Sequence, residues 1–241
     1  MVTKNQIKFV QSLHRKKYRQ KYSQFIVEGV KSVDELIHSD YSIEAIYATS
    51  DWINEQDVTS IDHMLVEGSK NDLERMSFFK SAAPVLAVVN QKTKTNIDSS
   101  GWVLCLDGIN DPGNLGTIIR VADWYGIKSL VCSENTVDLY NPKTISSSMG
   151  SFTRVNVQHT NLETYLQNID KPLFYTLLEG DSIYTQPKSE TGIIVIGGEA
   201  NGITQALLQL KHTGLTIPKL GGAESLNAGV AAAIICDRLL R

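Results

Sequence analysis

The sequence contains no long hydrophobic run and only three cysteines in 241 residues. No stretch of about 18 apolar residues occurs, so the sequence predicts no membrane-spanning helix. Cys105, Cys132 and Cys236 lie far apart among apolar neighbours, which excludes a zinc-type spacing and a disulfide framework. The charged N-terminal stretch has no apolar core, so we expect no secretory signal. These absences favour a protein of the reducing cytoplasm.

The sequence also lacks the motifs of several common enzyme classes. Neither G-x-G-x-x-G nor G-x-x-x-x-G-K-[ST] occurs, which disfavours a nicotinamide or ATP site. No G-x-S-x-G elbow is present, so a hydrolase would have no nucleophile of that type. The five histidines are scattered and are better explained as surface or structural residues than as ligands. We therefore expect no metal site.

Positive charge is concentrated at the N-terminal end of an otherwise acidic chain. Residues 1–31 contain eight Lys and Arg against one glutamate, a balance of +7. Because the whole chain carries a net charge of −3, the remainder carries −10. A basic segment on an acidic body is the pattern expected where a polyanion docks at one place. The alternative is a basic helix end that is simply solvated.

The first part of the chain alternates short helices and strands. Apolar periodicity predicts a small α/β module over residues 1–90. Residues 91–101 are polar and without periodicity, which is typical of an inter-domain linker. Strands are expected at 24–29, 43–49 and 84–90, and helices at 6–13, 30–39 and 69–77.

The second part, residues 102–241, repeats strand and helix regularly. Near-continuous apolar runs such as residues 102–108 are typical of strands buried on both faces. The alternation predicts a mainly parallel sheet with helices on both faces, and ligands bind such sheets beyond the carboxyl ends of the strands. Further strands are expected at 127–133, 153–158, 172–178, 192–199 and 214–218, and the last helix at 227–241.

Three glycine-containing loops follow strands of this sheet. They lie in the stretches 106–120, 195–203 and 217–241, the last of which includes the C-terminal helix. In the first, Pro112 and Gly113 predict a turn, Asn114 stands where a helix N-cap is expected, and Arg120 lies about two turns into the helix. Glycine lets backbone approach a ligand closely, so the loops predict a backbone-lined site at one edge of the sheet. The alternative is that the glycines serve only tight turns.

Three motifs in these loops are recognisable: "NDPGNLGTIIRVAD", "IGGEANGI" and "IPKLGGAESLNAGVAAAI". Together they resemble the signature motifs of the SpoU (TrmH-like) RNA ribose 2′-O-methyltransferases of the SPOUT superfamily. The segment "QFIVEGVKSVDELI" is similar to the L30e-like substrate-binding domain of that family. The resemblance implies a trefoil knot in the C-terminal domain, a homodimer with shared active sites, and S-adenosylmethionine as methyl donor.

The resemblance also implies roles for individual residues. Many relatives follow "SLN" with valine and serine, whereas Ala228 and Gly229 stand here; both are small and should pack. By position in the motifs, the catalytic group is Arg120, Asn114, Glu199, Ser225 and Asn227, and the cofactor contacts are Leu177, Gly197, Ile217 and Leu226.

The chemistry constrains the role of Arg120. A guanidinium has a pKa above about 12 and is a poor base. We expect Arg120 to stabilise the developing oxyanion and to hold a phosphate, while a water or phosphate oxygen accepts the proton. A structural alternative is a salt bridge from Arg120 to Asp123 or Glu199. Glu199 could hold Asn114 or Arg120 in place, and Ser225 and Asn227 could equally cap the last helix.

RNA rather than DNA is the expected partner, because only RNA has a 2′-hydroxyl. The residues expected to contact RNA are Arg15, Lys16, Lys17 and Arg19, with Tyr18 and Tyr22 interleaved among them. The extra N-terminal module favours ribosomal over transfer RNA by analogy with the family. The alternatives are a tRNA 2′-O-methyltransferase, a catalytically silent RNA-binding relative, and a methyltransferase with a non-RNA substrate. Which nucleotide is methylated stays open.

Overall fold

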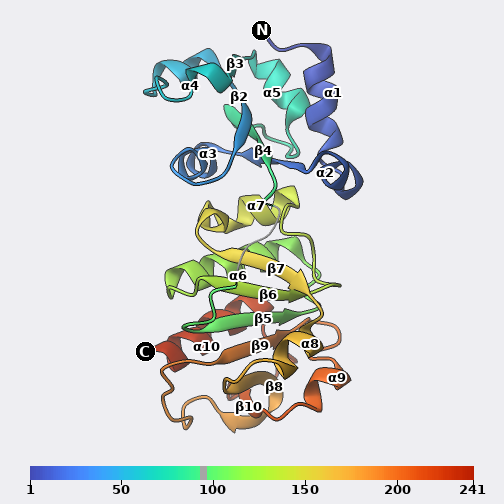
Figure 1. Cartoon of the computed structure of the whole chain (residues 1–241), viewed down its shortest axis with the longest axis vertical. Coiled ribbons are helices and arrows are strands. Elements are labelled where there is room, and N and C mark those ends of the chain that lie inside the picture. Colours follow the sequence, from blue (N-terminus) through green and yellow to red (C-terminus); the bar gives the residue numbers. More distant parts are fainter. Residues whose placement is uncertain (93–96) are drawn as a thin grey trace. The chain divides into compact units, whose positions relative to one another are not determined.

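The computed structural model describes residues 1–92 and 97–241, and the chain divides into two compact units (Figure 1). The N-terminal unit comprises Met1–Thr93 and Tyr140–Thr153. The C-terminal unit comprises Lys94–Leu139 and Arg154–Arg241. Residues 93–96, inside the predicted linker, lie outside the described residues. Each unit is built around a sheet of its own.

The N-terminal unit has a four-stranded sheet in the order β1-β4-β2-β3. β4 pairs antiparallel with β1 and with β2, and β3 pairs parallel with β2. The short polar helix α2 and the short strand β3 were not expected from periodicity. The elements are α1 (Lys4–Ser12), α2 (Lys16–Tyr22), β1 (Gln24–Glu28), α3 (Val30–Ile37), β2 (Ile43–Ala48), α4 (Ser50–Asn54), η1 (Asp62–Met64), β3 (Leu65–Glu67), α5 (Lys70–Met76) and β4 (Val85–Asn90).

The sheet of this unit is covered on both faces because its strands are apolar on both sides. Ile26 of β1 belongs to a core cluster with residues of α1 and α5. Its neighbour Phe25 points to the opposite face, where its ring lies 4.5 Å from Tyr140 and 6.1 Å from Phe152. These aromatic contacts explain why residues 140–153, with α7 (Pro142–Ser148) and η2 (Ser151–Thr153), pack with the N-terminal unit rather than with the chain on either side of them.

The C-terminal unit has a six-stranded sheet in the order β10-β8-β9-β5-β6-β7, and every neighbouring pair is parallel. The prediction of a mainly parallel sheet flanked by helices is confirmed. The remaining elements are β5 (Val103–Asp107), α6 (Pro112–Trp124), β6 (Ser129–Ser133), β7 (Asn156–Thr160), α8 (Leu162–Gln167), β8 (Leu173–Ser182), β9 (Ile193–Gly197), α9 (Gln205–Leu208), β10 (Thr213–Thr216) and α10 (Ala228–Leu240).

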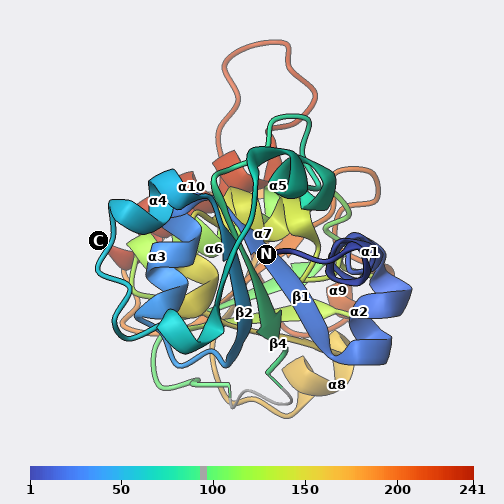
Figure 2. The same ribbon diagram turned by 90° about the horizontal axis from the view of Figure 1, so that it is seen from above.

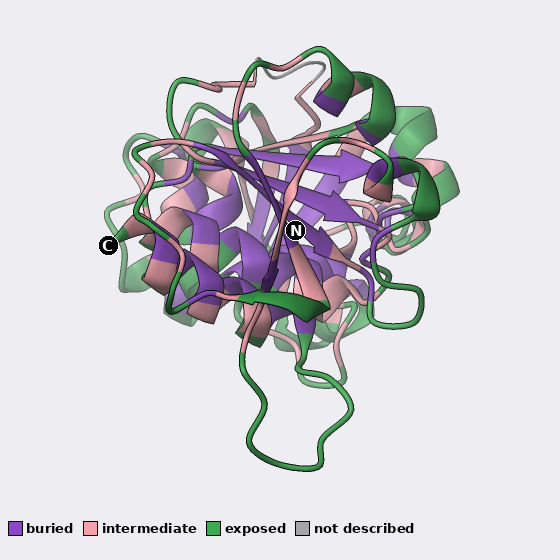
Figure 3. Ribbon diagram, turned by 90° about the horizontal axis from the view of Figure 1, so that it is seen from below, coloured by how far each residue is buried: buried purple, intermediate pink, exposed green. Residues whose placement is uncertain are grey.

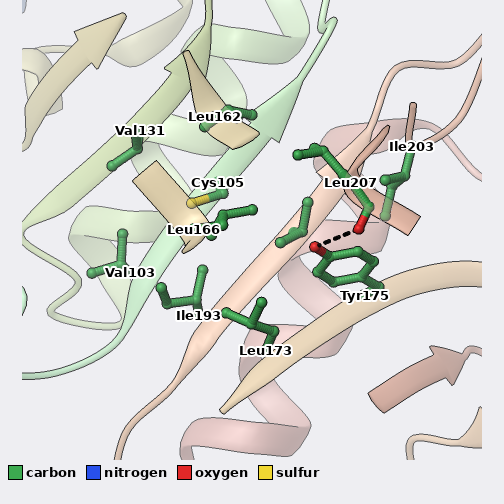
Figure 4. Close-up of a cluster of buried hydrophobic side chains, with 11 residues drawn as sticks. Val103, Cys105, Val131, Leu162, Leu166, Leu173, Tyr175, Ile193, Ile203 and Leu207 are labelled. Carbon is green, nitrogen blue, oxygen red and sulfur yellow. Dashed lines mark hydrogen bonds between the residues drawn. The ribbon is translucent and has the colours of Figure 1, made fainter. Parts of the chain in front are cut away.

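Successive side chains of the central strands point to opposite faces of the sheet, so each face has a hydrophobic core. These strands are buried along their length (Figure 3). Val103, Cys105 and Val195 pack under α8 and α9 in the cluster shown in Figure 4. Tyr175 closes this cluster, because its hydroxyl donates to the carbonyl of Leu207 at 3.1 Å. Burial raises the pKa of Tyr175 to about 12, so the phenol stays protonated.

Helices α6 and α10 pack against each other in the C-terminal unit. Near their C-terminal ends, the Tyr125 hydroxyl donates to a carboxylate oxygen of Asp237 at 3.0 Å. Gly126 follows α6 with a φ of +72°, the left-handed conformation that favours glycine after a helix. Within residues 1–92 and 97–241, no helix has the length and hydropathy of a membrane-spanning segment.

Candidate active site

The first loop, residues 106–120, begins at the end of β5, whose last residue is Asp107, and runs into helix α6. Asp111 is the N-cap of α6, and its Oδ1 accepts a hydrogen bond from the backbone N–H of Asn114 at 3.0 Å. The expectation that Asn114 is the N-cap was therefore wrong. Pro112 takes the first helical position, where its missing N–H costs nothing. As a result, the Asn114 side chain is available for other contacts.

The second motif loop is held against the end of β5 by Asp107, a residue that the sequence analysis did not single out. Asp107 is 3% exposed, and its Oδ2 accepts a hydrogen bond from the backbone N–H of Thr204 at 2.7 Å. Its carbonyl accepts from the N–H of Gly198 at 2.8 Å. A Cβ on Gly197 would lie 2.3 Å from the carbonyl carbon of Gly202, so no side chain fits there. The loop that carries Glu199 is thus fixed from two directions.

One residue from each of the three motifs meets in a hydrogen-bonded polar cluster. The Asn114 Nδ2 donates to Glu199 Oε1 at 2.5 Å. The Asn227 Nδ2 donates to Asn114 Oδ1 at 2.7 Å and lies 3.4 Å from the same Glu199 oxygen. Asn114 and Asn227 are 113 positions apart in the chain, so only the tertiary fold brings them together. We call Asn114, Glu199 and Asn227 the polar triad.

Asn227 has a second task in addition to the triad. It is the N-cap of α10, and its Oδ1 accepts hydrogen bonds from the N–H groups of Gly229 at 3.0 Å and Val230 at 3.3 Å. Its amide is therefore oriented: the oxygen faces the helix and the NH₂ faces the triad. The capping alternative for Asn227 is confirmed, and it coexists with a place in the site.

Arg120 stands exposed on α6 without the structural salt bridge that was considered for it. Asp123 instead pairs with Arg154, whose Nη2 lies 2.7 Å from Asp123 Oδ2. Glu199 is engaged by Asn114. Among the described residues, Arg120 has no hydrogen bond or ion pair, so its guanidinium is available to an external anion.

Ser225 and Leu226 lie in the loop that joins β10 to α10, and every residue from 218 to 227 is exposed (Figures 2 and 3). Ser225 is not brought to the polar triad by any hydrogen bond that the described residues make. Leu226 is 45% exposed and directly precedes Asn227. The loop therefore carries the third motif at the protein surface, next to the triad through Asn227.

The other predicted cofactor contacts lie on three neighbouring strands. Gly197 ends β9, and Leu177 is a half-buried residue of the adjacent strand β8. Ile217 directly follows β10, the next strand in the sheet. The register between β8 and β10 shifts between Gly214 and Leu215, which leaves the part of β8 around Leu177 unpaired with β10. In this part of β8 the Leu178 carbonyl instead accepts a hydrogen bond from the Thr216 side chain at 3.0 Å.

A separate cleft of about 260 Å³ opens on the α8 and α9 side of the sheet. Its lining includes Asp107, Ser133, Asn135, Asn161 and Thr204. None of the residues predicted as catalytic or cofactor-binding lines it. We therefore place the candidate active site at the polar triad and the ends of β8 to β10 rather than in this cleft.

The residues predicted to contact RNA differ in exposure. Arg15, Lys16 and Lys17 are exposed at the start of α2. Arg19 is 2% exposed, and its Nη1 donates to the carbonyls of Leu13 at 3.0 Å and His14 at 2.9 Å. A buried guanidinium that already binds main-chain carbonyls is not available to phosphates, so Arg19 is removed from the RNA-contacting set.

Comparison with known families agrees with the arrangement of the motifs. Residues 101–237 match the model of the SpoU rRNA Methylase family. Residues 4–87 match an MRM3-like substrate binding domain. The two matches cover most of the chain, and the first contains all three motif loops.

Individual relatives extend over nearly the whole chain. It is 34% identical to the 23S rRNA (guanosine(2553)-2′-O)-methyltransferase RlmP of Bacillus subtilis, over 98% of this chain and 96% of that protein. A solved TrmH-family structure from Porphyromonas gingivalis is 34% identical, with a TM-score of 0.89 over 99% of this chain and 98% of the other. An AdoMet-bound rRNA methyltransferase from Sinorhizobium meliloti shares the fold, with 23% identity and a TM-score of 0.86 over 99% and 95%.

Proposed function

Because the chain belongs to the SpoU rRNA methylase family, we propose that it methylates a ribose 2′-hydroxyl of ribosomal RNA with S-adenosylmethionine as donor. One observation supports this most: the polar triad joins all three motifs, and helix α6, which has Asn114 in its first turn, also carries Arg120, a cation without a partner among the described residues. The Bacillus subtilis relative acts on a guanosine of 23S rRNA, so this is the first substrate to test.

The residues at the ends of β8, β9 and β10 suit the donor. An adenosyl group needs apolar surface and backbone hydrogen-bonding groups. Leu177 and Ile217 supply the first. The missing side chain of Gly197 leaves room for the Gly202 backbone, which keeps the loop after β9 close to the strand. Leu226, on the exposed loop, is free to cover a bound molecule. When bound, the donor supplies a methyl group already activated by the positive sulfonium.

The chain's own contribution is alignment and electrostatics. Arg120 binds a phosphate of the RNA and stabilises negative charge as it develops on the ribose oxygen. It stays protonated, so a water or a phosphate oxygen takes the proton. Glu199 and Asn227 hold the Asn114 amide in one orientation through the hydrogen bonds of the triad. The fixed triad keeps the attacking oxygen in line, which is where much of the rate gain of such a transfer arises.

RNA is held in part by the basic N-terminal segment. Arg15, Lys16 and Lys17 are exposed and supply three positive charges at the start of α2. Such contacts are independent of sequence and fix position rather than specificity. They are consistent with a substrate-binding role for the N-terminal unit.

We further propose a homodimer through the face formed by α6 and α10. Trp124 is 78% exposed near the end of α6, and Val230 is 48% exposed on α10. Exposed apolar side chains of this size on packed helices are typical of a subunit interface. Arg120 lies one turn before Trp124 on the same side of α6, so a partner that covers Trp124 also reaches the active site. We also propose that the C-terminal unit contains the trefoil knot that the resemblance implies, and that the protein acts in the cytoplasm.

The decisive experiment is methyl transfer from methyl-labelled S-adenosylmethionine to ribosomal RNA purified from cells that lack the gene. We expect label in 23S rRNA, with the acceptor identified by mapping 2′-O-methyl marks with and without the gene. Label in transfer RNA alone would show that the substrate is transfer RNA rather than ribosomal RNA. No transfer to either RNA, with intact donor binding by calorimetry, would indicate a silent relative and contradict the proposal.

A further inference from the structure

Helix α2 presents a basic surface on a fixed support. Its sequence, KKYRQKY, contains no acidic residue. The buried Arg19 donates hydrogen bonds to the carbonyl of Leu13, at the end of α1, and to that of His14, in the turn that follows. Lys16, Lys17 and Lys21 remain exposed. The orientation of α2 is thus set by a buried arginine, while its lysines stay in solvent.

Helices α1 and α2 lie next to each other (Figure 2), and three aromatic rings from them contact one another near these lysines. The rings of Tyr18 and Tyr22 are 6.3 Å apart and nearly parallel, at 12°. The ring of Phe9 from α1 meets Tyr22 edge-on at 5.2 Å. Tyr22 is 40% exposed, although a tyrosine could be buried at little cost. Phe9 therefore supports a ring that remains open to solvent.

Cations and rings alternate on this surface. The Lys17 Nζ lies 5.8 Å from the ring centre of Tyr18, and the Lys21 Nζ lies 5.0 Å from that of Tyr22. We call Phe9, Lys17, Tyr18, Lys21 and Tyr22 the α2 face. The exposed ring of Tyr22 and the half-buried ring of Tyr18 each have a positive charge nearby.

This combination fits one kind of partner. Phosphates attract the lysines, and an unpaired base can stack on a tyrosine, which is how proteins hold single-stranded nucleic acid. Bases inside an RNA duplex are already stacked and do not offer their faces. An apolar protein surface would leave the lysines without counter-charges.

We propose that the α2 face binds an unpaired stretch of RNA, with Lys17 and Lys21 on phosphates and Tyr22 stacked on a base. The proposal rests on the proposed function only in taking RNA as the substrate. It adds that the N-terminal unit selects loops or single strands over helical RNA, and it identifies the helix that does so.

The first test measures binding of the full chain to a fluorescein-labelled oligoribonucleotide of roughly 12 nucleotides, single-stranded or annealed to its complement. Tyr18→Leu/Tyr22→Leu keeps apolar contact with Phe9 but removes the ring faces. We expect it to bind the single strand about tenfold or more weakly. Tyr18→Phe/Tyr22→Phe should bind like the parent, as should Tyr184→Leu, which alters a tyrosine that is 60% exposed in the C-terminal unit.

The second test separates charge from stacking. Lys17→Gln/Lys21→Gln should lower the slope of log affinity against log salt by about 1.4 for the single strand, which corresponds to two phosphate contacts. Lys70→Gln/Lys80→Gln removes the same charge from other exposed positions of the N-terminal unit and should leave the slope unchanged. This pair keeps the proposal testable even if the leucine variant fails to fold.

The proposal is overturned if the duplex binds as tightly as the single strand, if the leucine variant that retains the parent's circular dichroism binds like the parent, or if the two lysine pairs behave alike. These results are independent of methyl transfer. A chain that binds single strands through Tyr22 but transfers no methyl group contradicts the proposed activity alone, and active enzyme without that preference contradicts only the α2 face.

Discussion

The two units of this chain carry their functional groups in contrasting ways. In the N-terminal unit, the candidate binding groups are long, exposed lysines and an arginine on a short helix. In the C-terminal unit, they are short amides and a carboxylate at strand and helix ends, joined to one another by hydrogen bonds. Flexible cations tolerate variation in where a phosphate lies, whereas methyl transfer requires fixed geometry.

This difference suggests a division of labour. The unit with exposed charge contributes affinity, and the unit with the hydrogen-bonded triad contributes rate. Arg120 is the exception, because it is an exposed cation in the unit that performs the chemistry. Substitutions in the two units should therefore separate binding from catalysis, and Arg120 should affect catalysis.

The largest expected effect comes from Arg120→Ala. Removal of a group that stabilises charge in the transition state costs about 10²–10³ in rate, so methyl transfer should fall at least that far. Donor affinity by calorimetry should stay within about threefold, because no predicted donor contact is touched. Arg120→Lys, which keeps the charge, should recover part of the activity. Equal losses of donor binding and transfer would show that Arg120 supports the cofactor site instead.

Next in size is Gly197→Ala, which tests the close backbone approach at the end of β9. A new Cβ would lie 2.3 Å from the Gly202 carbonyl carbon, so the unfolding free energy in urea should fall by about 1–3 kcal/mol. Donor affinity should fall as well. The matched control is Gly221→Ala, where a Cβ meets open space and stability should change by less than about 0.5 kcal/mol. If the two variants lost the same unfolding free energy, the close contact between Gly197 and the Gly202 backbone would not matter for stability.

A third comparison distinguishes the arginine at α2 that stabilises the fold from the cations at its start that are expected to bind RNA. Arg19→Leu should reduce the unfolding free energy by about 1–3 kcal/mol, because the carbonyls of Leu13 and His14 lose their donor. Arg15→Ser/Lys16→Ser/Lys17→Ser should leave stability within about 0.5 kcal/mol but lower the salt slope of RNA binding by about 2. An unchanged slope would mean that the basic segment is only a solvated surface.

The smallest effect is a pH dependence in the N-terminal unit. Burial lowers the pKa of His14, aided by nearby Arg19 and opposed by the Met76 carbonyl and Glu28. The unfolded chain therefore binds a proton at His14 more readily than the folded chain. This residue's contribution to the unfolding free energy is fully present above the unfolded pKa of about 6.5, and it is lost as the pH falls through the lower pKa of the folded state. Urea unfolding near pH 7.5 and near pH 5.5 should show a smaller decrease for His14→Gln than for the parent. Equal decreases would contradict this assignment.

Much of the architecture could be predicted from local pattern. Apolar runs such as residues 102–108 and 192–199 correspond to β5 and β9, since strands buried on both faces are continuously apolar. The N-cap of α6 was misplaced by three residues, because Asp111 and Asn114 are both good caps and only the geometry selects Asp111. Helix α2 was missed because a seven-residue polar segment has no apolar periodicity.

The candidate site was only partly predictable, for a related reason. The motifs identified Asn114, Glu199 and Asn227 as polar positions, and the expectation that Glu199 could hold Asn114 is confirmed. The contact between Asn227 and Asn114 was not expected, and Asp107 drew no attention as the last residue of a strand. Its buried carboxylate matters because it accepts the Thr204 N–H from 97 positions away. Arg19 could not be told from its exposed neighbours, because burial depends on how α2 packs on α1.

The sequence by itself determined the strands of the parallel sheet and the family, because those depend on local periodicity and on short motifs. Tertiary structure alone decided which polar residues meet, which arginine is buried and which remains free. The physical reason is that hydrogen bonds and burial act between residues far apart in the chain, and such pairs leave no local pattern to read. Asn227 shows both sides: its place before a helix predicted a cap, and only the fold brought its amide to Asn114.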